Sequence, residues 1–198
     1  MKSDDEIRMP LDLQAETPVA FVCAVMARSE QDIQESCEGL SATFGDLTDR
    51  SQIYDFDVYS TYYSSEMGRG LHRCIARFGE PMLPSSLAAA KLDTLRLELR
   101  SARQVEGTQQ RTVNLDPGLL SPNSLVLATT KSSGHRIAIA PSLYAEVTLL
   151  FEKGAYCPLR WSYRDMQSRE VQTFLMRQRQ LLLDAMGGVR RVGAGEVP

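Results

Sequence analysis

The sequence predicts an α+β fold built on a mainly antiparallel sheet. Three observations support this: an apolar run is followed directly by a helical pattern, several short segments then alternate apolar and polar residues, and two further helical patterns stand well apart. The predicted order is strand, helix, strand, strand, helix, strand, which suits a ferredoxin-like βαββαβ core. We expect a β-hairpin to extend this core and a C-terminal helix to close it.

The first strand and the first helix follow each other directly. Residues 19–26 form a continuous apolar run rich in β-branched side chains, as expected of a strand buried on both faces. Ser29 then offers an N-cap, with Asp32 three residues later. Apolar residues recur at helical spacing as far as Gly45, where we expect the helix to end.

Two strand-like segments and a second helix come next. Residues 51–63 are aromatic and alternate, and residues 71–78 alternate arginines with apolar side chains, so both predict strands. Residues 85–102 predict a helix because Ala, Leu, Lys, Arg and Glu dominate, although the last turns also alternate as a strand would. Residues 111–115 supply a short strand. The inward face of the helix is expected to carry Ala88, Leu92, Leu95, Leu99 and Ala102.

The last third predicts a hairpin and a closing helix. Residues 135–140 and 143–151 are joined by a Pro-Ser turn, and residues 155–161 add one more antiparallel strand. Residues 168–186 predict a helix that a Gly-Gly pair ends. Its expected inward residues are Val171, Phe174, Leu175, Leu182 and Ala185.

Length and composition indicate one globular domain. We predict a flexible segment over residues 1–17, a single domain over 18–187 and a flexible tail over 188–198. The 43% hydrophobic and 24% charged residues are typical of a globular chain. The chain has neither the roughly 20-residue apolar run of a membrane span nor a signal-peptide pattern, so we predict a cytoplasmic protein. The four cysteines form no C-x-x-C pair, which favours reduced thiols.

Charge is unevenly distributed along the chain. Residues 1–66 hold 14 of the 25 Asp and Glu but 4 of the 22 Lys and Arg, so residues 67–198 hold 11 against 18. This either places an anionic ligand on the later part or gives one domain two complementary faces.

The segment from Thr129 to Arg136 has the composition of a phosphate-binding loop. It brings together hydroxyls, the ammonium of Lys131, the imidazole of His135 and a guanidinium around one glycine. Such groups hold phosphate through charge-assisted hydrogen bonds. No G-x-x-x-x-G-K-[ST] loop is present, so this is not a Walker A site. We predict that Thr129, Thr130, Lys131 and Arg136 bind the ligand; the alternative is a polar surface loop.

Three residues are candidates for acid–base chemistry: Asp116, His135 and Glu146. Asp116 lies in Asn-Leu-Asp-Pro-Gly over residues 114–118, which is also a turn pattern. His135 is a candidate general acid or base but has no histidine or cysteine partner nearby, so no metal site is predicted and a structural role is equally open. Glu146 lies in an apolar strand and acts as a base or ligand only if its face lines a cleft.

Several motifs in one order carry a family resemblance. At YDFDVYSTYYSSEMG, RTVNLDPGLLSPNSLVLATTK and HRIAIAPSLYAEVTLLF, followed by WSYRDM, the chain resembles a bacterial family catalogued as domain of unknown function 4416, over residues 18–183. The resemblance implies a small, single-domain bacterial cytosolic protein with no established activity, and some relatives carry the label of GTP-binding protein. The family's characteristic residues map onto Tyr62, Tyr63, Glu66, Met67, Gly68, Asn114, Asp116, Pro117, Gly118, Thr129, Thr130, Lys131, His135, Arg136, Tyr144, Ala145 and Glu146.

The resemblance and the basic residues complete the predicted site. Tyr63, Glu66 and Asn114 join the ligand-binding set from the family pattern, and Arg111 joins it as a cation at the start of the same stretch. The chain departs from the family pattern at residues 60–61, where a Thr-acid pair is expected. It departs again at residues 163–166, where the family has Tyr-Pro-Asp-Tyr.

We expect the protein to bind a phosphate-bearing small ligand, with a nucleotide as one candidate. If the site is catalytic, phosphoryl transfer or hydrolysis is the expected chemistry. The sequence leaves open whether it is an enzyme, and it names no cofactor and no oligomeric state. The alternative is a non-catalytic module that binds RNA through exposed tyrosines flanked by Arg73, Arg77 and Arg136, or that binds another protein.

Overall fold

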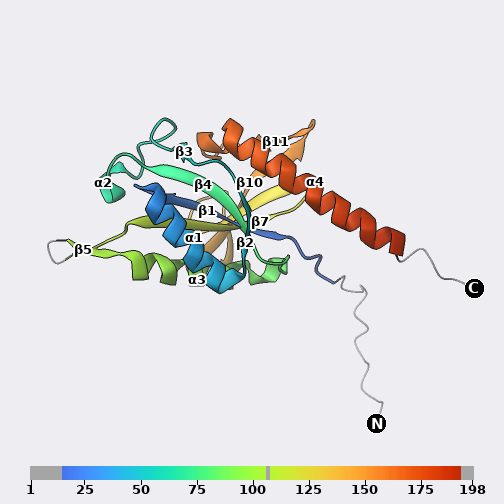
Figure 1. Ribbon diagram of the computed structural model, residues 1–198, viewed down its shortest axis with the longest axis horizontal. Helices are drawn as coiled ribbons and strands as arrows, with labels where there is room; N and C mark the ends of the chain where they lie inside the picture. The colour runs from blue at the N-terminus through green and yellow to red at the C-terminus, as the bar shows by residue number, and fades with distance from the viewer. Residues whose placement is uncertain (1–14, 106–107, 193–198) are drawn as a thin grey trace, which may run out of the picture.

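The computed structural model describes residues 15–105 and 108–192 (Figure 1). Its strands are all short to medium in length, and helices lie on both sides of the main sheet. The elements in chain order are β1 Ala20–Ala27, α1 Glu30–Phe44, β2 Leu47–Arg50, β3 Tyr54–Asp55, α2 Ser64–Met67, β4 His72–Phe78, η1 Pro84–Ser86, α3 Leu87–Ser101, β5 Arg103–Val105, β6 Thr108–Gln110, β7 Val113–Leu120, β8 Ser124–Thr129, β9 Ile137–Ala140, β10 Leu143–Glu152, β11 Ala155–Pro158, η2 Arg164–Gln167 and α4 Arg169–Val192.

The main sheet confirms the predicted α+β class. Its strands lie in the order β11-β10-β8-β7-β1-β4-β2, with β3 beside β4 and β9 beside β10, and the pairings are antiparallel. The four strands β1, β2, β4 and β7, joined by the crossovers α1 and α3, take the spatial order β7-β1-β4-β2. This is the strand order of the predicted ferredoxin-like core. The strands β8 to β11 extend the sheet beyond β7, and β5 and β6 form a separate hairpin.

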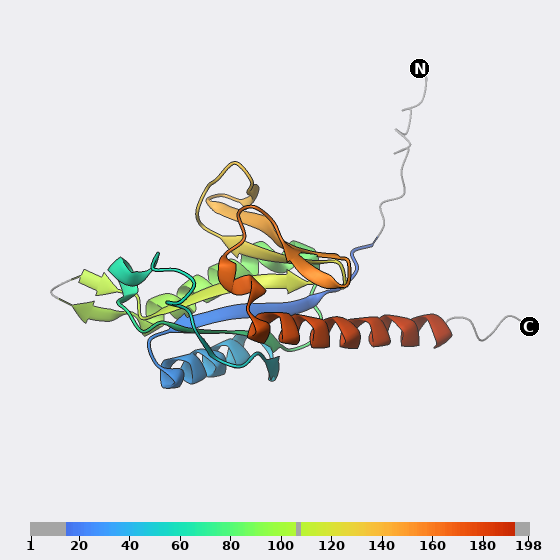
Figure 2. The same ribbon diagram turned by 90° about the horizontal axis from the view of Figure 1, so that it is seen from above.

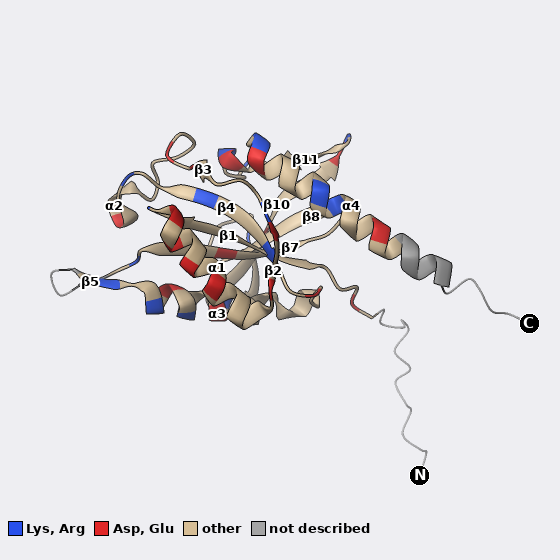
Figure 3. Cartoon of the chain, in the orientation of Figure 1, with Lys and Arg blue, Asp and Glu red and all other residues tan. Residues whose placement is uncertain are grey.

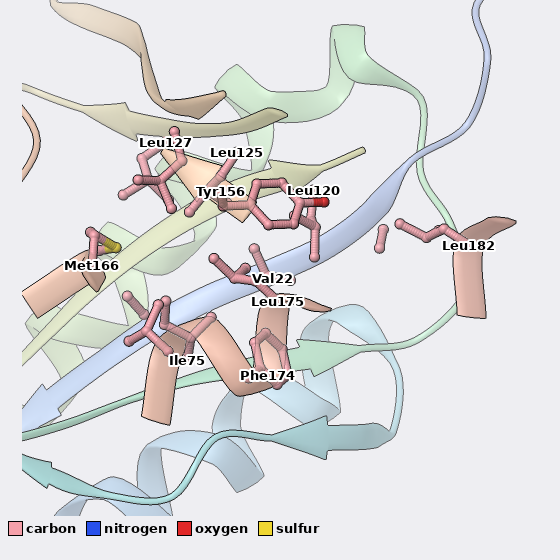
Figure 4. Close-up of a cluster of buried hydrophobic side chains, with 14 of the residues drawn as sticks. Val22, Ile75, Leu120, Leu125, Leu127, Tyr156, Met166, Phe174, Leu175 and Leu182 are labelled. Carbon is pink, nitrogen blue, oxygen red and sulfur yellow. The ribbon is translucent and has the colours of Figure 1, made fainter. Parts of the chain in front are cut away.

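Both faces of β1 are buried. Phe21, Cys23 and Val25 pack with residues of α1 and α3, whereas Val22 and Ala24 belong to the cluster under α4. Figure 4 shows the second cluster, in which Val22 and Ile75 of the sheet lie near Phe174 and Leu175 of α4 and the strand residues Leu120 and Leu125. The apolar run at residues 19–26 is continuous because both faces of β1 are covered and neither contacts water, as predicted.

The first helix begins and ends where the sequence predicts. The hydroxyl of Ser29 accepts a hydrogen bond from the backbone N–H of Asp32 at 3.0 Å, and the helix stops at Gly45, whose φ of 94° suits a residue without a side chain. The strand predicted over residues 71–78 is β4, and the predicted hairpin is β9–β10. The four cysteines are free thiols, and none of the described helices is long and apolar enough to cross a membrane.

Several predicted boundaries are wrong. The core strand is β2, and only Tyr54–Asp55 of the segment 51–63 pairs as a strand. The predicted turn at residues 114–118 lies inside β7, and the strand β8 is not predicted at all. The glycine pair does not end α4, because a helix tolerates glycine at a cost of about 1 kcal/mol each. Residues 188–192 are therefore helical, and the rest of the predicted tail and residues 1–14 lie outside the described part.

The inward face predicted for α3 is wrong at two of its five residues, while the other three are half-buried. Leu92 and Leu99 are 45% and 60% exposed, whereas the polar residues Lys91, Thr94 and Glu98 are buried. The inward face of α4 is as predicted at Val171, Phe174, Leu175 and Leu182 but not at Ala185, which is exposed.

Candidate pocket between strands β7 and β8

The main sheet splits between two neighbouring strands. Strand β7 pairs with β8 only through residues 118–120 against 125–127. Beyond that point residues 113–117 stay on β1, while residues 128–129 pair with β10 on the other side. Figure 2 shows β8 and β10, in yellow and orange, turning away from β7 and β1. The split leaves a pocket between the first half of β7 and the end of β8.

Pro117 and Gly118 mark the point where the strands part. The backbone N–H of Leu115 points away from β1, toward the split, so by the alternation of a strand the nitrogen of Pro117 faces the same way. Proline has no N–H to donate, which explains why pairing with β8 starts only at Gly118. A Cβ at Gly118 would lie 2.5 Å from Leu127 Cδ2 and 2.7 Å from the Val126 oxygen, so the paired half requires a glycine there.

Two side chains of α3 replace the missing strand. The carboxylate of Glu98 accepts the N–H of Leu115 at 2.6 Å, and the ammonium of Lys91 donates to the Leu115 carbonyl at 2.8 Å. Buried backbone groups need such partners, because an unpaired one costs about as much as a lost hydrogen bond. This is why α3 turns Lys91 and Glu98 inward and leaves Leu92 and Leu99 exposed. The pKa of Glu98 is raised mainly by its burial, against the opposing effect of Lys91.

The pocket is small and its lining is rich in cations. It encloses about 60 Å³, far less than the roughly 300 Å³ or more of pockets that bury a whole drug-sized molecule. The lining residues are Tyr63, Arg73, Lys91, Leu95, Arg111, Asn114, Asp116, Leu127, Ala128, Thr129, Thr130, Lys131, Arg136, Glu146 and Tyr163. Five of them are cations and two are carboxylates, so the lining favours an anion.

Asp116 is the centre of a buried ionic network on the β7 wall. Its carboxylate accepts hydrogen bonds from Arg73 at 3.2 Å and Asn114 at 2.9 Å, and Lys91 lies 3.5 Å away. Burial alone would raise the pKa of Asp116, but Lys91, Arg73 and Asn114 together hold it below its usual value. Asp116 is therefore ionised at neutral pH and cannot serve as a general acid there.

Arg73 and Arg111 extend this network in two directions. Arg73 is buried and also donates to Asp165, which is 0% exposed and receives the hydroxyl of Tyr54 at 2.7 Å. Arg111 donates to Asn114 at 2.9 Å and pairs with Glu98 at 3.3 Å and with Glu66 at 2.8 Å.

The β8 wall carries a second, smaller network. Arg136 Nε donates to the Glu146 carboxylate at 2.7 Å, and its Nη1 donates to the Lys131 carbonyl at 2.8 Å. The same Glu146 oxygen meets His135 Nε2 at 3.2 Å, and the His135 ring stacks on Trp161 with centroids 4.7 Å apart. Arg136 thus holds the backbone of Lys131, at the start of the loop after β8, and the Glu146 carboxylate in fixed positions relative to each other.

The structure brings most of the predicted site residues to one pocket. Asp116, Glu146, Thr129, Thr130, Lys131, Arg136, Arg111, Asn114 and Tyr63 line it. His135 and Glu66 do not line it; they contact it through Glu146 and Arg111.

Six lining residues carry no prediction for this site: the apolar Leu95, Leu127 and Ala128, and the polar Arg73, Lys91 and Tyr163. Arg73 lies on β4, two strands from β7, and Lys91 lies on a helix face expected outside. Cross-strand register, which a single sequence does not contain, is what places Arg73 here. Among the described residues no group of three or more His, Cys, Asp or Glu is arranged to hold a metal ion.

The comparisons with known proteins give a family without an activity. A family model described as a domain of unknown function, DUF4416, matches residues 17–181. No curated protein and no solved structure matches the chain.

Proposed function

We propose that this chain, which belongs to the DUF4416 family, binds the phosphate group of a small ligand in the pocket between β7 and β8. The family description names no ligand, so the proposal rests on the pocket. The observation that carries it is Lys131, because the other lining cations, Arg73, Lys91, Arg111 and Arg136, each pair with a carboxylate.

Lys131 has no carboxylate within 4 Å in the described part of the chain. Its ammonium donates to the Tyr62 hydroxyl at 2.9 Å and lies 4.3 Å from the Tyr62 ring centroid and 5.1 Å from that of Tyr63. Cation–π contacts at an exposed site contribute only about 0.5–1 kcal/mol, whereas hydrogen bonds to charged groups contribute roughly 1.5–3 kcal/mol. A phosphate in the pocket would therefore outcompete the two rings for this ammonium.

The size of the pocket fits the phosphate end of a ligand. A cavity of about 60 Å³ is several times the roughly 10–15 Å³ that one bound water needs. Such a space accommodates one phosphate group with its first few atoms, while the remainder of a nucleotide would lie outside. We assign phosphate contact to Lys131, Arg136 and Thr130. To Asp116 we assign the role of holding Arg73 and Lys91 in place.

The RNA-binding alternative is disfavoured by the burial of the residues it needs. Tyr54 and Tyr63 are each 7% exposed and Arg73 is 2% exposed, so these three cannot stack a base on an open sheet, and Tyr62, at 56%, is the exposed tyrosine of the segment. Helices cover both faces of the sheet, and α1 carries four acidic residues and no basic one (Figure 3).

A thermal-unfolding screen tests the proposal. Purified wild type is heated with inorganic phosphate, phosphate monoesters and nucleotides, beside Lys131→Ala and the control Arg100→Ala, which removes an exposed charge outside the pocket. A ligand at 100 times its Kd should stabilise the native state by about 2.7 kcal/mol. We expect this shift in wild type and in the control, and its loss in Lys131→Ala. Stabilisation by no phosphate compound, or equal stabilisation of all three proteins, rejects the proposal.

A further inference from the structure

Glu146 presents an unused hydrogen-bond acceptor to the pocket. Its side chain is 5% exposed and lines the pocket, and both of its hydrogen bonds, from Arg136 and His135, are made to one oxygen, Oε2. The other oxygen, Oε1, receives no hydrogen bond from any residue that the structure describes. An ionised carboxylate has about four acceptor positions, so half of this group is without a protein donor.

An acceptor on the pocket wall is open to a donor from the ligand. Oε1 is not among the described side-chain atoms that are buried without a partner, so solvent reaches it, and a ligand that covers it without a donor loses the hydrogen bond that water makes. A phosphate dianion cannot supply the donor, because it has only acceptor oxygens and because its negative charge repels the Glu146 carboxylate. The donor must come from another part of the ligand.

The donor is better matched by a neutral hydroxyl than by an ammonium. Arg136 already neutralises the Glu146 charge through its 2.7 Å ion pair. The same guanidinium holds the Lys131 carbonyl, so Glu146 and the phosphate-binding ammonium are fixed on one wall. A ligand that reaches both must carry its hydroxyl within a few atoms of its phosphate.

We propose that the pocket selects a small phosphorylated alcohol, with the phosphate on Lys131 and Arg136 and a nearby hydroxyl donating to Glu146 Oε1. This inference rests on the proposed phosphate binding and adds a substrate class to it. Glu146 is then the residue that determines specificity, and His135 positions its carboxylate from behind.

Two probes with the same three-carbon skeleton test the inference. Glycerol 3-phosphate carries hydroxyls that 1-propyl phosphate lacks, and calorimetric titration gives a Kd for each. Wild type should bind glycerol 3-phosphate at least about tenfold more tightly, as expected for a hydrogen bond to a charged group. Glu146→Gln should lower this ratio because its remaining acceptor oxygen is neutral, whereas Lys131→Ala should weaken both probes by a similar factor and keep the ratio.

The outcomes separate this inference from the proposed function. Equal affinity of wild type for the two probes overturns the hydroxyl assignment and leaves phosphate binding intact. Failure of wild type to bind either probe overturns phosphate binding itself. Because the wild-type ratio decides the question, the test does not depend on the folding of Glu146→Gln.

Discussion

The two halves of strand β7 satisfy the same backbone requirement in different ways. Residues 118–120 pair with β8 in an ordinary ladder and carry small or apolar side chains. In the other half the backbone of Leu115 is paired with Lys91 and Glu98 of α3, and the neighbouring side chains, Asn114 and Asp116, are polar. Residues 118–120, the closed half of β7, complete the core, whereas residues 113–117, the open half, leave room for a pocket.

This difference shows how a sheet can open without losing stability. A split strand exposes backbone donors and acceptors that must find partners. Lys91 and Glu98, seven residues apart on one helix face, supply one donor and one acceptor to the same residue. Lys91 also lines the pocket and contributes to its charge. The same side chain therefore satisfies the unpaired backbone and makes the pocket polar.

The largest expected effect comes from replacing Arg73 of β4, which pairs with Asp116 in the open half of β7. Arg73→Met leaves Asp165, which is 0% exposed, without its cation, and loss of one partner of a buried pair costs roughly 3–5 kcal/mol. Urea unfolding measures this loss. Arg96→Met removes one member of an exposed pair on α3 and should cost less than about 1 kcal/mol. Equal losses in the two variants would show that the network does not stabilise the split.

Glu98→Ala tests the repair of the strand directly. The variant leaves the Leu115 N–H without an acceptor and should cost about 2–3 kcal/mol, while Glu98→Gln, which keeps an acceptor oxygen, should cost less. Amide hydrogen exchange should accelerate at Leu115 in the alanine variant. Glu35→Ala, on the exposed side of α1, is the control. An unchanged exchange rate at Leu115 would mean that water or another group replaces Glu98.

Gly118→Ala tests the closed half. The added methyl would meet the Leu127 side chain and the Val126 backbone, and overpacking of this kind costs about 2 kcal/mol. Thermal unfolding should show the loss. Affinity for a phosphate probe should fall little, since Gly118 does not line the pocket. A variant as stable as wild type would show that the two strands can separate freely at this point.

The smallest effect is the pH dependence of Asp116. Its folded pKa lies below the unfolded value of about 3.9, so its stabilisation is complete well above pH 4 and is lost as pH falls through the folded pKa. Asp116→Asn should be about 1 kcal/mol less stable than wild type near pH 7, because hydrogen bonds to an ionised group are roughly twice as strong as neutral ones. Unfolding curves from pH 7 to 3 should show this difference shrink below pH 4. A difference that widens on acidification contradicts the sign.

The sequence predicts the closed, apolar parts of the molecule better than the open ones. The run 19–26, the cap at Ser29 and the face of α4 follow rules in which apolar side chains turn inward. The face of α3 breaks that rule, because Lys91 and Glu98 have a backbone to satisfy. Asn114, Asp116 and Pro117 of β7 have the composition of a turn for a related reason. This half of the strand is not paired with β8, so the missing N–H of Pro117 removes no ladder hydrogen bond.

Part of the candidate site can be predicted from the sequence, because much of it lies in one stretch of the chain. Residues 111–146 form neighbouring strands, so their polar side chains converge through local chain order. Arg73 and Tyr163 reach the pocket through long-range packing that no local pattern contains. A second signal was available, namely two opposite charges, Lys91 and Glu98, which are seven residues apart and therefore on one face of the helix.

The most direct test of phosphate binding in the open half is a titration of ¹⁵N-labelled protein with inorganic phosphate, followed by the amide resonances. Binding between β7 and β8 predicts saturable shifts at Asn114 to Asp116 and at Thr129 to Lys131, with little change at residues 118–120. Shifts confined to other basic surfaces, such as Arg169 and Arg177 at the start of α4, or no saturable shift at all, would contradict it.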